Sequence, residues 1–221
     1  MLAQQFIDDA PSISRHSLLL ASGSRFTFDG PIQPIAIEDI ASALAKLCRW
    51  GGATREFYSV AQHSVHVSRL AAKIAEDAGG SAELQQIAAF AGLMHDAHEM
   101  VLADICRPTK GWMDETHYRG FGSGLSSAEQ IIDMRLGEAL GSWAGSLHRR
   151  RWKVANYVRT ADNLALAIER RDLMPPVDEV WPDIPTDTEI VDHPPITPLE
   201  WRHARDLFVA RWHALNAGAA P

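Results

Sequence analysis

Two histidines and two aspartates in this chain have side chains and spacings that suit a shared metal ion. The first histidine is His63, the second stands directly before an aspartate as His95-Asp96, and the last aspartate is Asp162. Imidazole and carboxylate ligands together suit a borderline divalent ion such as Mn, Co, Ni, Fe or Zn better than Ca, and Mg is possible. A His-Asp dipeptide alone is weak support, because it occurs by chance in many chains.

Helical periodicity predicts that these side chains point inward. A capping box over residues 59–62 predicts the start of a helix on which His63 continues an apolar stripe. A second helix, capped by Ser81, carries His95 at the end of its apolar stripe, so antiparallel packing would bring the two imidazoles together. Asp162 lies on the apolar stripe of a long helix expected over residues 151–174. A carboxylate is costly to bury there unless it is paired or bound to metal.

Such a metal site would have room for chemistry. Four protein ligands on a six-coordinate ion leave two positions open, one for water and one for a phosphate oxygen. Glu99 falls four residues after His95, one helical turn further on, and can lean over the same site. It could orient or deprotonate the water, or protonate the leaving oxygen, and the sequence leaves these roles open. A phosphomonoester is the simplest substrate for this arrangement.

The chain of 221 residues suits one domain with appendages. We expect an N-terminal arm over residues 1–36, with a short strand or hairpin near residues 25–30. A helical domain should follow over residues 37–174, including helices at 37–47 and 128–140. Residues 111–127 are rich in glycine and predict a loop over the site. A proline-rich connector and a C-terminal helix should pack on the same domain over residues 175–221, with the helix starting at the capped segment 197–200.

Composition excludes several classes of function. The net charge of −7 argues against a nucleic-acid polymer as partner, although it allows a small anionic substrate. No apolar run approaches the ~20 residues that span a membrane, and no secretory signal is visible. Only two cysteines are present, so a reducing cytoplasm is the expected location. The apolar face of the last helix predicts a core or subunit contact, and we expect a homo-oligomer.

The order His63, His95-Asp96, Asp162 resembles that of the HD-domain metal phosphohydrolases over roughly residues 37–174. The resemblance implies an all-α helical bundle with a metal site between helices. The stretch His-Asp-Ala-His-Glu lacks the Gly-Lys that follows His-Asp in cyclic-dinucleotide phosphodiesterases. It also lacks the Glu-Asp pair of alarmone hydrolases, so the 5'-deoxynucleotidase branch is the most similar.

Four further residues receive roles from this resemblance alone. Arg49-Trp50 matches an Arg-Trp pair of the 5'-deoxynucleotidases, in which Arg contacts phosphate and Trp crowds the sugar 2'-position. Asp104 and Lys110 match an Asp that bonds the sugar 3'-hydroxyl and a Lys near phosphate. Without the family, the same residues would be interpreted as a cation at a helix end, an aromatic at the core edge, a helix-end carboxylate and a solvated lysine.

The resemblance thus predicts metal-dependent hydrolysis of (deoxy)nucleoside 5'-monophosphates to nucleoside and phosphate. Glu99, Arg49 and Lys110 would act in catalysis, and Arg49, Trp50, Asp104 and Lys110 would bind the substrate. Two alternatives stay open. One is a deoxynucleoside triphosphate triphosphohydrolase that releases tripolyphosphate, because residues 111–127 depart from the monophosphatase pattern. The other is a metal-stabilised nucleotide-binding module without turnover.

The four-ligand hypothesis predicts that Asp96→Ala loses its metal. Because a bound ion stabilises only the folded state, the variant should also melt at a lower temperature than the parent. Elemental analysis of the purified variant is the direct measurement, and a full metal content would rule Asp96 out as a ligand.

Overall fold

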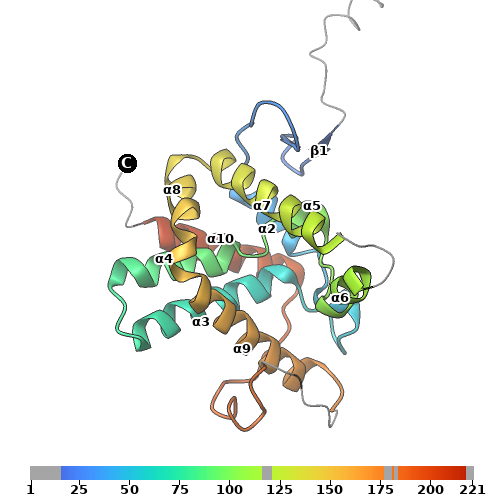
Figure 1. The fold of residues 1–221 in the computed structure, drawn as a ribbon, viewed down its shortest axis with the longest axis vertical. Helices are drawn as coiled ribbons and strands as arrows, with labels where there is room; N and C mark the ends of the chain where they lie inside the picture. The colour runs from blue at the N-terminus through green and yellow to red at the C-terminus, as the bar shows by residue number, and fades with distance from the viewer. Residues whose placement is uncertain (1–15, 116–120, 177–180, 182–183, 218–221) are drawn as a thin grey trace, which may run out of the picture.

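Helices make up most of the fold, and a two-stranded β-hairpin precedes them (Figure 1). The structure, a computed structural model, describes residues 16–115, 121–176, 181 and 184–217. Its elements in chain order are β1 (Ser17–Leu19), β2 (Arg25–Thr27), α2 (Ile37–Leu44), η1 (Arg49–Gly52), α3 (Val60–Asp77), α4 (Ala82–Met94), α5 (Glu99–Leu102), α6 (Arg107–Glu115), α7 (Phe121–Ala139), α8 (Ser142–Arg150), η2 (Arg151–Val154), α9 (Ala155–Leu173) and α10 (Trp201–Asn216). This architecture confirms the expected all-α fold with a short β arm.

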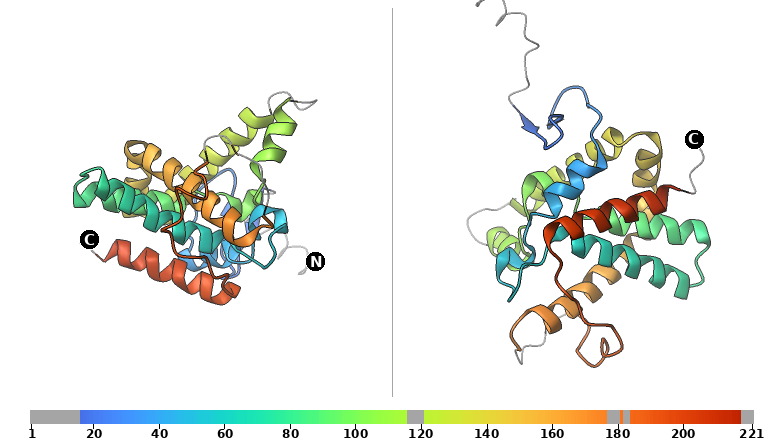
Figure 2. Two further views of the ribbon diagram at one scale, coloured as in Figure 1. Left: turned by 90° about the horizontal axis from the view of Figure 1, so that it is seen from below. Right: turned by 180° about the vertical axis from the view of Figure 1, so that it is seen from behind.

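The antiparallel helices α3 and α4 lie side by side, and α9 packs against both of them (Figure 1). On the opposite side, α10 packs against α2, α3 and α4, as the right-hand view of Figure 2 shows. Apolar side chains of these helices meet in one core, whose fully buried members include Ile40, Leu44, Leu93 and Phe208. The apolar face expected for the last helix is the one that α10 buries. None of the described helices is long and apolar enough to cross a membrane.

Capping residues and a glycine determine where the central helices α3 and α4 begin and end. Ser59 accepts a hydrogen bond from the backbone N–H of Gln62 at 3.2 Å, which is one half of the predicted capping box. The Gln62 side chain bonds instead to the backbone of Thr197 and Leu199. Ser81 caps α4 in the same way through the N–H of Leu84 at 3.3 Å. Between them, Gly79 ends α3 in the left-handed region with φ 74°, where glycine carries no Cβ penalty.

The two central helices are in close contact at Gly92. A Cβ added there would lie 3.0 Å from the Cα of Ser68 and 3.0 Å from the backbone oxygen of Val67. The Ser68 hydroxyl donates to the backbone oxygen of Ala89 at 2.7 Å and ties the helices together at the same level. Because His95 follows Gly92 by one helical turn, this contact sets how near the end of α4 comes to α3.

The β-hairpin is held on the helical body by α7. β1 and β2 pair antiparallel, with Leu18 opposite Phe26, and Phe26 is buried. Arg135 of α7 donates to the backbone oxygens of Thr27 at 2.7 Å and Gly30 at 2.9 Å. The hairpin expected near residues 25–30 is therefore present.

The predicted loop over residues 111–127 is wrong in its described parts. Helix α6 continues to Glu115, and α7 already starts at Phe121; residues 116–120 lie outside the described residues. A helical glycine costs only about 1 kcal/mol relative to alanine, so tertiary contacts can override it. One such contact is the ion pair between Lys110 of α6 and Glu129 of α7, with Nζ and Oε1 2.9 Å apart.

Three helix boundaries also differ from the predictions. Helix α2 ends at Leu44, because the chain turns to pair with the start of α3: Arg49 N–H donates to the Tyr58 oxygen at 2.8 Å. The helix expected from Arg151 begins as the 3-10 turn η2 and becomes α-helical at Ala155. Helix α10 starts at Trp201, and its cap is the side chain of Glu200.

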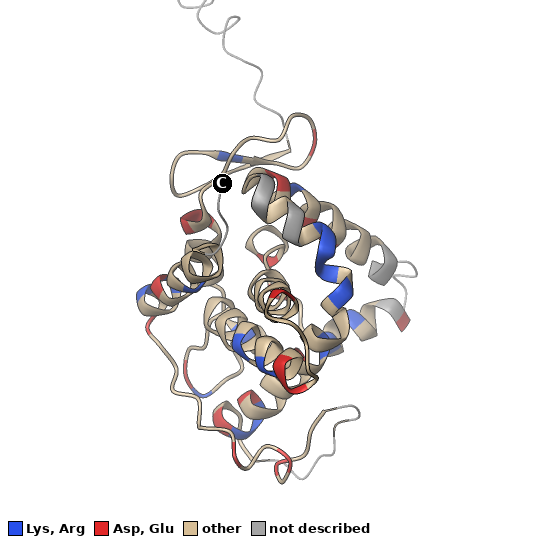
Figure 3. Ribbon diagram, turned by 90° about the vertical axis from the view of Figure 1, so that its left-hand side faces the viewer, with Lys and Arg blue, Asp and Glu red and all other residues tan. Residues whose placement is uncertain are grey.

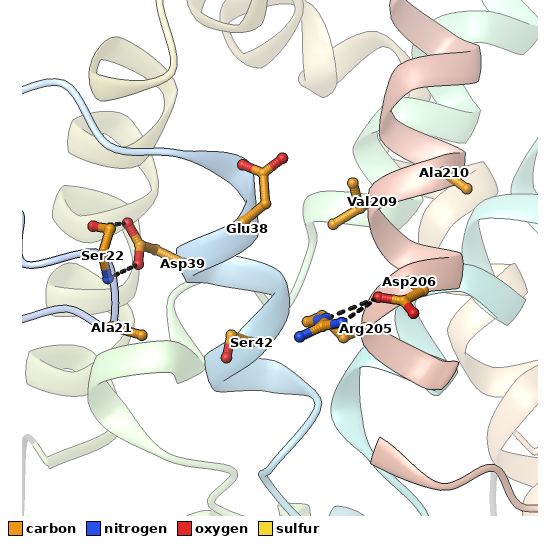
Figure 4. Close-up of a pocket in the computed structure, with 9 residues that line it drawn as sticks. All are labelled: Ala21, Ser22, Glu38, Asp39, Ser42, Arg205, Asp206, Val209 and Ala210. Atoms are coloured by element: carbon orange, nitrogen blue, oxygen red, sulfur yellow. Dashed lines mark hydrogen bonds and ion pairs between the residues drawn. The ribbon is translucent and has the colours of Figure 1, made fainter. Parts of the chain in front are cut away.

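A groove of about 520 Å³ opens between the β1–β2 turn, α2 and α10 (Figure 4). Its polar side chains largely bond to one another. Ser22 donates to Asp39 at 2.7 Å on one side, and Arg205 pairs with Asp206 at 2.7 Å on the other. None of the residues predicted to bind metal or substrate lines this groove.

The close contact at Gly92 predicts that Gly92→Ala destabilises the fold by about 1–3 kcal/mol, a usual range for overpacking. The neighbours that must move are backbone atoms of α3, and the end of α4 should shift with them. Gly111→Ala is the matched control, because a Cβ at that exposed position of α6 meets nothing within 4 Å. Denaturant unfolding of both variants measures the effect; equal stability of Gly92→Ala and the parent would contradict it.

Candidate metal centre

The structure brings His63, His95, Asp96 and Asp162 together around one point. His63 Nε2 lies 3.2 Å from His95 Nε2, 3.5 Å from Asp96 Oδ2 and 3.3 Å from Asp162 Oδ1. His95 Nε2 lies 3.2 Å from Asp96 Oδ2 and 3.9 Å from Asp162 Oδ1. Ligands that bind one ion at ~2.0–2.2 Å are ~3 Å apart when they are at right angles. The donor atoms of His63, His95 and Asp162 thus form one compact group with the spacing that a divalent ion requires, and Asp96 Oδ2 adjoins it through both histidines.

Three separate segments supply these donors. His63 comes from the first turn of α3 and is fully buried. His95 and Asp96 belong to the turn between α4 and α5, of which His95 is the residue that caps α4. Asp162 comes from the second turn of α9 and is the most exposed of the four donors. The ion would therefore link α3, α9 and the turn after α4.

Hydrogen bonds at Nδ1 orient both imidazoles. The Nδ1 of His95 lies 2.8 Å from the backbone oxygen of Gly92, and the Nδ1 of His63 lies 2.6 Å from Oε1 of Glu169. A carbonyl and a carboxylate both accept hydrogen bonds, so each Nδ1 carries the proton. Each Nε2 then presents its lone pair to the shared point, as a metal ligand must.

Glu169 is a site residue that the sequence analysis missed. Its side chain is fully buried, and besides His63 it accepts a hydrogen bond from the indole Nε1 of Trp50 at 3.0 Å. The signal was present, because Glu169 follows Asp162 by seven residues, two helical turns along α9. The argument that singled out Asp162, a carboxylate on a buried stripe, applies equally to Glu169.

The cluster contains an excess of negative charge. The side chains of Asp96, Asp162 and Glu169 are 15%, 21% and 0% exposed, and Arg49, at 11%, is the cation buried among them. With neutral imidazoles and Arg49 as the buried cation, two negative charges remain among the buried groups; the exposed Arg107 offsets part of the charge of Asp162, and a divalent cation would neutralise the rest. Burial alone would lower the pKa of His95, but the charges of Asp96 and Asp162 outweigh it and raise the pKa to about 9. The donor set therefore attracts positive charge, whether a proton or a metal ion.

Arg49 and Trp50 lie against this cluster. Arg49 Nη1 is 3.4 Å from Asp96 Oδ2, and its Nη2 is 3.6 Å from Glu169 Oε2. Trp50 has φ 60°, a left-handed conformation that is uncommon for any residue other than glycine. Its ring packs on Trp181 with centroids 5.6 Å apart. Arg49 is thus enclosed by the site and is not a solvated cation at the end of α2.

Glu99 and Asp104 border the cluster on the side of α5. Glu99 is the first residue of α5 and is buried, and its carboxylate lies within 4.8 Å of ligand atoms of Asp96 and His98. Burial, and then the charges of Asp96 and Asp104, raise the pKa of Glu99 to about 9. Ala103, with φ 62°, ends α5, and Asp104 follows it half-buried.

The two cations on α6 take different positions. Lys110 pairs with Glu129, as described above, and its charge still acts on Asp104. Arg107 was not predicted, yet its Nη2 lies 2.6 Å from Asp162 Oδ2, the oxygen turned away from the two histidines. Because Arg107 is 57% exposed, this ion pair adds little stability, but it places a guanidinium beside a metal-ligand candidate.

Comparison with known proteins agrees with this geometry. The family model of the HD domain matches residues 60–167, a segment that contains His63, His95, Asp96 and Asp162. The uncharacterized protein YfdR of Escherichia coli is 32% identical over 199 residues, which cover 88% of this chain and 93% of YfdR. An uncharacterized protein of Rhodobacter capsulatus is 40% identical over 94 residues, 41% of this chain and 45% of that protein. The chain therefore belongs to the HD domain family of metal-dependent phosphohydrolases.

Proposed function

We propose that this protein hydrolyses deoxynucleoside 5'-monophosphates to deoxynucleoside and phosphate. The observation that carries the proposal is the Arg49-Trp50 pair beside the four converging donors, with Arg49 Nη1 3.4 Å from Asp96 Oδ2. A guanidinium next to a metal ligand lies where it would meet an oxygen of a phosphate bound at the ion. The family resemblance assigns the same roles to these two residues.

His63, His95, Asp96 and Asp162 would hold the ion, and their spacing and charge fit a divalent transition metal. When bound, such an ion supplies Lewis-acid activation of water and of the phosphoryl group. Arg49 would neutralise charge that develops on the phosphoryl oxygens, and its burial strengthens that interaction. Lys110 would assist once it exchanges Glu129 for phosphate.

Glu99 would serve as the proton carrier. Burial is the largest cause that raises the pKa of Glu99, and a carboxyl group that retains its proton at neutral pH is suited to protonate the leaving sugar oxygen. Its burial beside Asp96 keeps it within reach of a substrate bound at the ion. The same group, once deprotonated, would orient the attacking water.

Trp50 and Asp104 would select the sugar. A bulky indole excludes a 2'-hydroxyl by steric overlap, and a carboxylate accepts a hydrogen bond from a 3'-hydroxyl. In support, the Trp50 ring is fixed by contacts to Glu169 and Trp181, so that it would not yield readily to a larger sugar. Lys and Arg are interspersed with Asp and Glu in the view of Figure 3, which supports a small substrate over a nucleic-acid polymer.

Arg107 supports one competing function, a deoxynucleoside triphosphate triphosphohydrolase. Its exposed guanidinium at Asp162 would meet a second or third phosphate group in a longer chain. The other alternative, a binding module without turnover, has less support, because a buried Glu99 of raised pKa is an unneeded cost in a protein that only binds.

The test of the proposal is product analysis with a panel of nucleotides and Mn²⁺ or Co²⁺. We expect phosphate release from deoxynucleoside 5'-monophosphates, with ribonucleotides hydrolysed more slowly. Release of intact tripolyphosphate from deoxynucleoside triphosphates, with monophosphates untouched, would assign the protein to the competing function. Absence of any product from a metal-loaded protein would support the binding module.

Glu99→Gln should retain the metal and the fold and lose turnover. The amide fills the same space but cannot carry a proton, and loss of general acid–base catalysis lowers rates by ~10²–10⁴-fold. Steady-state kinetics with a deoxynucleoside monophosphate measure the fall in kcat, and elemental analysis checks the metal. An unchanged kcat would remove Glu99 from the mechanism.

Trp50→Ala should narrow the preference for deoxyribose over ribose. Removal of a steric contact in a binding pocket is worth ~1–3 kcal/mol, or ~10–200-fold in the ratio of kcat/KM values. The measurement compares one deoxynucleotide with its ribonucleotide for the variant and the parent. A preference that survives the substitution would assign sugar selection to another residue.

A further inference from the structure

One buried carboxylate contacts the metal centre and the substrate-binding pair at the same time. Glu169 divides its two oxygens between them: Oε1 accepts from His63 Nδ1 at 2.6 Å, and Oε2 accepts from Trp50 Nε1 at 3.0 Å. Arg49 Nη2 lies 3.6 Å from the same Oε2. Glu169 is fully buried, so these groups, together with the neighbouring Tyr58, surround its charge in place of water.

The backbone and the indole of Trp50, which Glu169 connects to His63, are conformationally constrained. Trp50 has φ 60° and ψ 24°, and Gly51 follows with φ 60°. A tryptophan remains in this left-handed conformation only when its surroundings over-determine it. Two contacts do so here: the hydrogen bond to Glu169 and the ring contact with Trp181. The position of the indole thus depends on the carboxylate that orients a metal ligand.

We propose that Glu169 is a positioning residue that couples metal binding at His63 to the placement of Trp50 and Arg49. The side chain acts through its neighbours and need not touch metal or substrate. Coupling of this kind is reciprocal: loss of the hydrogen bond between Trp50 and Glu169 weakens the metal site, and loss of the metal weakens that hydrogen bond. That Trp50 faces a sugar rests on the proposed function, but its link to the metal does not.

Accepting one hydrogen bond at each oxygen requires glutamate at position 169. Two N–H groups, from His63 and Trp50, approach two different oxygens of residue 169. Glutamine has one acceptor oxygen and one NH₂ group, so it can accept from one partner and must turn a donor against the other. Glu169→Gln keeps the size of the side chain and breaks one of the two connections.

The proposed connection from His63 through Glu169 to Trp50 is tested by measuring metal affinity. The affinity is measured by chelator competition with Mn²⁺ or Co²⁺ in the absence of nucleotide. Glu169→Gln should bind the ion about 10–100-fold more weakly, the usual effect of losing a partner of a metal-bound histidine. Trp50→Phe removes the N–H that donates to Glu169, together with part of the ring, and leaves Oε2 with Arg49 as a partner at 3.6 Å, so the carboxylate can turn. It should weaken metal binding about 5-fold or more, although Trp50 is no ligand.

The matched control is Trp181→Phe, which makes the same change in the neighbouring ring. Trp181 packs on Trp50 but has no hydrogen bond to Glu169 among those of the described residues, so its variant should bind metal like the parent. In the Glu169→Gln background, Trp50→Phe should cause no further loss, because the connection through which it acts is already broken.

Two results would overturn the inference: parent-like metal affinity in Trp50→Phe, or an equal loss in Trp50→Phe and Trp181→Phe. A role of Trp50 in packing alone would lower the melting temperature and leave the metal affinity of the folded protein unchanged. If Glu169→Gln fails to fold, the difference in metal affinity between Trp50→Phe and Trp181→Phe still tests the inference. Failure of the proposed function would be distinct, because it would appear as absent nucleotide hydrolysis by a protein whose metal affinities follow this pattern.

Discussion

The repulsion among buried carboxylates is the constraint on which the site depends. Asp96, Asp162 and Glu169 meet within the helical body, where removing each charge from water costs several kcal/mol unless it is compensated. Arg49 compensates one charge, and the two imidazoles offer lone pairs or protons toward the rest. A divalent cation would complete the balance. The metal is thus an expected part of the folded state as well as of the chemistry.

The packing of the helices sets the spacing between the two histidines and the buried carboxylates. α3 and α4 touch backbone to backbone at Gly92, which places the turn with His95 against the start of α3. Helix α9 packs against both and supplies Asp162 beside the Nε2 atoms of the two histidines and Glu169 beside Nδ1 of His63. The turn itself is anchored to α7, since His98 Nδ1 lies 3.1 Å from Asp133. Packing therefore holds each of the proposed metal ligands in place, with or without a bound ion.

Much of this arrangement was predictable from the sequence, for a physical reason. The helical period is regular, so a polar residue such as His63 or Asp162 on an apolar stripe must face the core. The same period would have found Glu169 if the stripe on α9 had been followed one turn past Leu166. The caps at Ser59 and Ser81 depend only on near neighbours in the chain and were likewise correct.

Other features depend on contacts between distant segments, which a single sequence does not reveal. Arg107 meets Asp162 across 55 positions, and Trp181 reaches Trp50 from a proline-rich connector. The helices in the glycine-rich region after Lys110 form because α6 and α7 pack on each other, which local propensity does not report. The spacing of Lys110 matches the family pattern, but its pairing with Glu129 was not visible from the sequence.

The central claim is that one divalent ion binds His63, His95, Asp96 and Asp162. Anomalous diffraction from crystals of the protein grown with Mn²⁺ or Co²⁺ tests it most directly. The account predicts a single strong peak ~2.0–2.3 Å from His63 Nε2, His95 Nε2 and one oxygen of each aspartate. Asp96, His98 and Glu99 form another group whose ligand atoms lie within 4.8 Å of one another. A peak at that group alone, or no peak between the two histidines, would contradict the account.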